Sequence, residues 1–135
     1  MIDFGALIGE HAEIDRLIAE VEDLSRSSTP CPAEVLGALT TLHATLAEHL
    51  CREDDMMYPR LVDDAEIAVS APALAMISEF HYLTGDWSLY LLSWPLTRIS
   101  AEWARFGQET RALMARLHRR VDRENSLLYR SSRAR

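Results

Sequence analysis

The chain has 135 residues, 48% hydrophobic and 26% charged, and this balance excludes a disordered or fibrous protein. Its net charge of −7, from 21 acidic and 14 basic residues, opposes general binding to the phosphate backbone of nucleic acids. The sequence contains no apolar run long enough to span a membrane and no export signal at its first residues, so we expect a cytoplasmic protein.

The spacing of inward-facing residues predicts two helical segments in the first half of the chain. The first ends at the Ser- and Pro-rich stretch 25–32, and the second runs from about Glu34 to Tyr58-Pro59. The inward residues of the first are Leu7, His11, Ile14, Ile18 and Val21. Those of the second are Leu39, Leu42, Leu46, His49, Glu53 and Met57.

Two further helical segments are predicted in the second half. The third begins at residues 70–72 and ends at Trp94-Pro95, and the fourth runs from about Ile99 to Tyr129. The inward residues of the third are Leu74, Ile77, His81 and Thr84. Those of the fourth are Trp103, Phe106, Thr110, Leu113, Leu117, Arg120, Glu124 and Leu127.

No alternation typical of strands competes with these helical patterns. Because each apolar stripe must be buried against the others, the sequence predicts an all-α fold, an up-down-up-down antiparallel four-helix bundle. We expect one domain over residues 1–135, with a disordered tail at about 130–135.

Two other features bear on function. Cys31 and Cys51 do not form a CxxC motif, and we interpret both as free thiols. Arginines are concentrated near the C-terminus, at Arg111, Arg116, Arg119, Arg120, Arg123, Arg130, Arg133 and Arg135. A solvated helix face is the simpler interpretation, and binding of an acidic partner is the alternative.

Several ionisable residues lie on the stripes that face the core. They are His11, His49, Glu53, His81 and Glu124. A buried carboxylate or imidazole is disfavoured by several kcal/mol unless it is paired, hydrogen-bonded or bound to a metal. Taken singly, each is more often a hydrogen-bonded core residue or an exposed one, but four helices that each contribute at least one favour a shared metal site.

His49 and Glu53 lie four residues apart, so both project from one helix face and can bind the same ion or adjacent ions. Imidazole nitrogen with carboxylate oxygen suits iron, manganese or zinc better than calcium or magnesium. His43 and His118 fall off the inward lines, and we expect both at the surface. Trp87, Trp94 and Trp103 are interpreted as packing residues.

Residues 48–59 resemble the His-x-x-x-Glu-Glu-x-x-x-Phe/Tyr-Pro motif of hemerythrin-like HHE cation-binding domains, with His49, Glu53 and Tyr58-Pro59 at matching positions. Residues 120–129 resemble the second copy of that motif, with Glu124 at its glutamate. With His11 in the first helix, the resemblance spans nearly the whole chain.

The resemblance implies a bundle that holds a non-haem di-iron centre. It implies membership among proteins that bind or sense oxygen, respond to redox state or iron, or repair nitrosatively damaged iron centres. The ligands that it implies here are His11, His49, Glu53, His81 and Glu124.

The sequence departs from the family's pattern at Arg120, where a histidine would stand four residues before Glu124. Arginine stays protonated and cannot ligate iron, but at this spacing it can pair with Glu124 or lie between Glu124 and Glu53. The cofactor prediction is therefore one or two iron ions, or none where Arg120 replaces them. Gly85 stands where oxygen carriers have a second histidine on the third helix, and Arg130 stands where proline would follow tyrosine.

Two functions follow from these observations. The first is a metal-binding protein that binds or senses oxygen, nitric oxide, redox state or iron with a reduced ligand set. The second is a metal-free bundle that acts as an interaction module and docks an acidic protein or a copy of itself. No nucleophile lies beside a base, so we do not expect an enzyme beyond weak oxidase- or peroxidase-like chemistry.

Overall fold

All regular structure in the described part of the chain is helical. The computed structural model describes residues 4–52 and 82–133, with side chains described for residues 5–49 except Leu7 and for residues 82–126. The helices are α1 (Phe4–Ser25), α2 (Pro32–Arg52), a helix over residues 82–93, α5 (Leu96–Ala101) and α6 (Trp103–Arg133). None of these described helices combines the length and the apolar run needed to cross a membrane. The predicted all-α class is confirmed.

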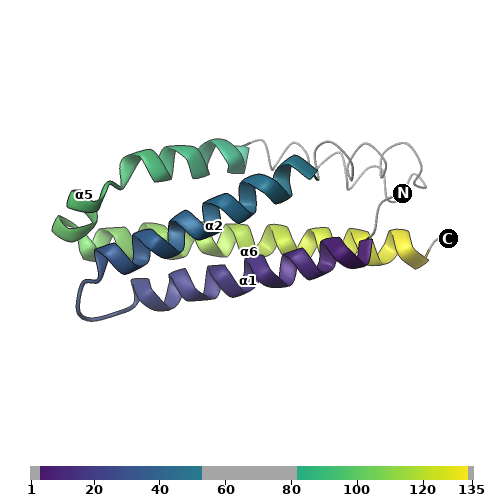
Figure 1. The fold of residues 1–135 in the computed structure, drawn as a ribbon, viewed down its shortest axis with the longest axis horizontal. Coiled ribbons are helices and arrows are strands. Elements are labelled where there is room, and N and C mark those ends of the chain that lie inside the picture. The colour runs from purple at the N-terminus through teal and green to yellow at the C-terminus, as the bar shows by residue number, and fades with distance from the viewer. Residues whose placement is uncertain (1–3, 53–81, 134–135) are drawn as a thin grey trace.

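The long helices lie side by side (Figure 1). α1 contacts both α2 and α6, and α5 contacts α2 and α6. The helix over residues 82–93 meets α2 where Trp87 Nε1 donates a hydrogen bond of 3.1 Å to His43 Nδ1, and it meets α6 where the Tyr90 hydroxyl lies 2.6 Å from Thr110 Oγ1. This arrangement is compatible with a four-helix bundle. The up-down-up-down order stays a prediction, because residues 53–81 lie outside the described part.

The loop between α1 and α2 is held by side chains of α6. Trp103 Nε1 donates a hydrogen bond of 2.9 Å to the Ser27 carbonyl, and Arg111 Nη1 donates one of 3.2 Å to the Ser25 carbonyl. A Cβ atom added to Gly107 would lie 3.1 Å from the Ser25 carbonyl oxygen, so the absence of a side chain lets α6 approach the end of α1. These contacts fix the axial position of α6 relative to α1.

Cys31 in this loop is a free thiol, as predicted. Its Sγ lies 3.5 Å from the Leu24 carbonyl oxygen, and burial raises the pKa of the thiol above its ordinary value. The raised pKa lowers the thiolate fraction of Cys31 and therefore its reactivity. The side chain of Cys51 lies outside the described residues.

The predicted end of the third helix at Trp94-Pro95 is confirmed, but the predicted continuous fourth segment is wrong at its start. Glu102 separates α5 from α6 with φ −126° and ψ 48°, which is outside the helical range. Its backbone N–H donates to the Arg98 carbonyl at 2.9 Å, and Arg98 Nε donates to its carboxylate at 2.8 Å. These two contacts between Arg98 and Glu102 stabilise the end of α5 at the residue before α6 begins.

Most predicted inward residues are buried. On α1 and α2 these are His11, Ile14, Ile18, Val21, Leu39, Leu42, Leu46 and His49. On α6 they are Phe106, Thr110, Leu113, Leu117, Arg120 and Glu124. Thr84 is exposed, so that prediction is wrong. The buried residues of this helix are Leu83, Trp87 and Tyr90, and the buried Trp94 directly follows it, because the aromatic rings fill the core. Glu53, Met57, Leu74, Ile77 and His81 lie outside the described residues.

Aromatic rings fill the end of the described helices that is remote from the chain termini. Phe106 is fully buried, with ring centroids 6.3 Å from Tyr90, 5.3 Å from Trp94 and 5.7 Å from Trp103. Trp87 lies 5.7 Å from Tyr90 and extends the cluster. The interpretation of the three tryptophans as packing residues is confirmed.

Replacing Phe106 with alanine should lower the free energy of unfolding by about 3–5 kcal/mol, because it leaves a cavity among three aromatic rings. Leu92→Ala is the control, since Leu92 is 82% exposed and its loss should change stability by less than about 0.5 kcal/mol. Urea denaturation followed by circular dichroism measures both. Equal effects of the two changes would contradict this account of the core.

A surface ion pair also links α1 to α6. His118 Nδ1 lies 3.0 Å from an Asp15 carboxylate oxygen, and Nε2 lies 3.4 Å from Asp122. The hydrogen bond to Asp15 is the main reason that the pKa of His118 is raised above 6.5, with smaller contributions from Asp122 and Glu22 and an opposing one from burial.

The stabilisation from this pair should be complete below pH 6.5 and should be lost as the pH rises through the raised pKa of His118. The side chain is 52% exposed, so solvent screening limits the effect to about 1 kcal/mol or less. His118→Gln should therefore destabilise the protein at pH 5.5 and have little effect at pH 9. A pH-independent effect, measured by urea denaturation, would contradict this assignment.

Candidate metal centre

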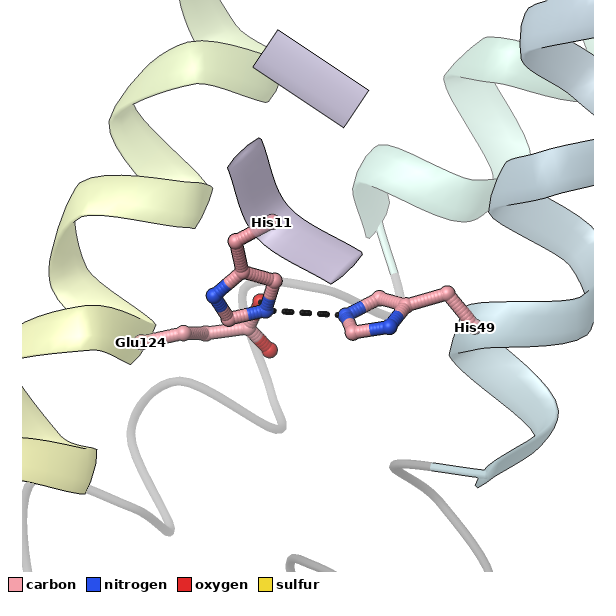
Figure 2. Close-up of side chains that lie close together, drawn as sticks. All are labelled: His11, His49 and Glu124. Atoms are coloured by element: carbon pink, nitrogen blue, oxygen red, sulfur yellow. Dashed lines mark hydrogen bonds and ion pairs between the residues drawn. The ribbon is translucent and has the colours of Figure 1, made fainter. Parts of the chain in front are cut away.

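His11 on α1, His49 on α2 and Glu124 on α6 meet in the core, and Figure 2 shows their side chains directed toward one another. They are 0%, 2% and 1% exposed. The Nε2 atoms of the two histidines lie 2.9 Å apart, and Glu124 Oε1 lies 3.3 Å from His11 Nε2. Residues far apart in the sequence therefore form one buried cluster.

The helices place these side chains together because each one continues an apolar stripe. His11 lies one turn before the buried Ile14, and His49 lies one turn after the buried Leu46. α1 packs against both α2 and α6, so His11 is the member that contacts the other two.

Oxygen acceptors on the far side of each ring determine where the protons lie. His49 Nδ1 donates a hydrogen bond of 2.8 Å to Glu10 Oε1, because a carboxylate can only accept. His11 Nδ1 likewise lies 2.6 Å from Asn125 Oδ1, which is an acceptor. In the neutral rings, each Nδ1 carries the proton and each Nε2 presents its lone pair to the centre.

Three electron-pair donors thus converge: two Nε2 atoms and one carboxylate oxygen. Two neutral imidazoles repel each other in this orientation unless a proton or a metal ion lies between them. The separations of 2.9 and 3.3 Å match those between neighbouring ligands of one ion, since bonds of about 2.1 Å at right angles place donors about 3.0 Å apart. The residues present therefore fit a divalent first-row metal ion, and nitrogen with carboxylate oxygen suits iron, manganese or zinc.

Arg120 lies beside Glu124, as its i, i+4 spacing predicted. Arg120 Nε is 3.7 Å from Glu124 Oε2, and the Arg120 side chain is only 6% exposed. A guanidinium offers only donors, so Arg120 cannot be a ligand. Glu124 is therefore the acidic partner of a buried cation and a potential ligand at the same time.

The other predicted ligands, Glu53 and His81, lie outside the described residues. His43 and His118 are exposed, as predicted, and belong to contacts away from the buried cluster. Glu10 and Asn125 were missed by sequence reasoning because they are half-buried and lie beside the inward stripes. The one signal in the sequence was their position, since Glu10 directly precedes His11 and Asn125 directly follows Glu124.

The fold and this cluster define a helical protein with a buried histidine–carboxylate site for a cation. The model of the hemerythrin HHE cation binding domain matches residues 4–131, which is nearly the whole chain. The chain belongs to this family, so the predicted resemblance is confirmed, and membership implies that the domain binds a metal cation. Comparisons with curated proteins and with solved structures found no match.

Glu10→Gln should weaken metal binding by about 10- to 100-fold, because an amide is a poorer acceptor for the Nδ1 proton and orients His49 less firmly. Glu10 side chain exposure of 29% makes the substitution compatible with folding. Glu13→Gln, on the same helix, removes a carboxylate that pairs with Arg16 at the surface and should leave the affinity unchanged. Competition between the protein and a chelator for Co²⁺ measures both, and equal affinities would show that Glu10 does not support the site.

Proposed function

We propose that the chain binds non-haem iron through His11, His49 and Glu124 and uses it to bind or sense oxygen, nitric oxide, redox state or iron. The observation that carries the proposal is the pair of Nε2 atoms 2.9 Å apart, in rings whose Nδ1 atoms each lie within hydrogen-bond distance of an oxygen acceptor. A buried arrangement of this kind is stabilised by a cation at its centre. Family membership supports the same conclusion.

The chain's own residues have separate tasks in this proposal. His11 and His49 supply neutral nitrogen donors, and their Nδ1 partners Asn125 and Glu10 hold the rings in orientation. Glu124 supplies negative charge, and burial keeps bulk water from competing for it. Iron, when bound, supplies a redox-active cation with affinity for small diatomic molecules. Glu53 and His81 remain predicted ligands, and the cytoplasmic location and the absence of a dedicated enzymatic activity remain predictions.

The contact between Arg120 and Glu124 favours a second candidate function. A guanidinium that already compensates the buried carboxylate reduces the need for a metal ion. Under this alternative, the bundle is metal-free and the arginine-rich part of α6, including the exposed Arg119, docks an acidic protein or a second copy. His49→Ala would then leave partner binding intact.

Metal analysis separates the two functions. Protein produced with iron supplied and purified without an affinity tag should contain iron by plasma mass spectrometry, and His49→Ala should lose most of it because one of the central donors is removed. His43→Ala is the matched control, since this exposed histidine lies on the same helix as His49 but outside the buried cluster and outside the exposed group of Asp15, His118 and Asp122, which could also hold an ion. Wild-type protein without iron, manganese or zinc would reject the proposed function and favour the interaction module.

A further inference from the structure

The two carboxylate oxygens of Glu124 face different side chains. Oε1 lies 3.3 Å from His11 Nε2 and faces the histidine pair, whereas Oε2 lies 3.7 Å from Arg120 Nε. The two side chains are 1% and 6% exposed, so water screens neither interaction effectively. One carboxylate thus connects the cation site to a permanently charged guanidinium.

The Arg120 charge has a consequence for the number of ions. A carboxylate that bridges two metal ions offers one oxygen to each, but the oxygen on the second side of Glu124 here faces a guanidinium. A divalent ion bound at Oε2 would lie close to the Arg120 charge, where like charges repel several times more strongly than in bulk water. Arginine cannot relieve this repulsion by losing its proton.

We propose that Arg120 is the second cation of this centre, so that the chain binds one metal ion at His11, His49 and Glu124 Oε1. This inference rests on the proposed function, because it requires the histidine pair to bind a metal. It makes the centre mononuclear, whereas the resemblance implied a di-iron centre. Arg120 compensates the charge of Oε2 in place of a second metal ion.

The same charge should weaken the binding of the one ion, because Glu124 is shared between the ion and the guanidinium. Arg120→Met keeps an unbranched apolar stem and removes the charge, so it should raise the affinity for a divalent ion by about tenfold or more. Arg120→Lys keeps a cationic side chain at this position and should bind the ion less tightly than Arg120→Met does. Arg119→Met is the matched control, since Arg119 is the adjacent residue and is exposed.

Anaerobic titration with Co²⁺, followed by visible absorption and by chelator competition, gives both stoichiometry and affinity. We expect one Co²⁺ per chain in the wild type, Arg119→Met and Arg120→Lys, with tighter binding in Arg120→Met and helix content unchanged by circular dichroism. Two ions per wild-type chain would overturn the inference, and so would unchanged or weaker binding by folded Arg120→Met. Neither result would contradict the proposed function of iron binding. No Co²⁺ in any of the proteins would instead defeat the proposed function.

The wild-type protein provides a readout that does not depend on any variant. X-ray absorption of the Co²⁺-loaded protein should show nitrogen and oxygen neighbours but no second metal within about 4 Å, the separation typical of two-metal sites. A metal–metal distance in this range would overturn the inference even where Arg120→Met fails to fold.

Discussion

The close approach of the His11 and His49 rings, whose planes are inclined at 74°, is the constraint around which the described helices are organised. The Nδ1 atom of each ring lies within hydrogen-bond distance of an oxygen acceptor, and the two Nε2 atoms lie 2.9 Å apart in a region with almost no solvent exposure. Removing imidazoles and a carboxylate from water is unfavourable unless a cation or hydrogen bonds compensate them. The same helices must therefore bury the apolar side chains and also bring together the partners of these buried polar groups.

α1 connects the packing to the site. It contacts both α2 and α6, and its far end is held by the hydrogen bonds from Trp103 and Arg111 to the α1–α2 loop and the end of α1. Those contacts, with the close approach at Gly107, set the axial position of α6. Glu124 lies on the same continuous helix as Gly107 and Arg111. The contacts of those two residues with the end of α1 therefore also set the position of the Glu124 carboxylate along the helix axis, next to His11.

Charge balance distinguishes this chain from a simple cluster of ligands. Glu10 lies at the edge of the site and accepts a hydrogen bond from His49, while Arg120 lies in the core and compensates the charge of Glu124. A buried pair such as Arg120 and Glu124 contributes little net stability, because desolvation offsets the attraction, but removal of one partner leaves an uncompensated charge. The pair therefore bears more directly on what Glu124 can bind than on how stable the bundle is.

The sequence by itself determined the all-helical class, the family, the break at residues 25–32 and the end at Trp94-Pro95, because helical spacing and proline act locally. It also placed His11, His49, Arg120 and Glu124 on inward faces, since a side chain on an apolar stripe must face the core. It missed the interruption at Glu102 and assigned Thr84 instead of Leu83 to the core, because both depend on how aromatic rings pack between helices. Only the tertiary structure decided that Glu10 and Asn125 hold the two imidazoles and that Glu124 faces His11 and Arg120 with different oxygens. The contacts of the two imidazoles join separate helices, and the positions of those helices along their axes cannot be predicted from a local sequence pattern.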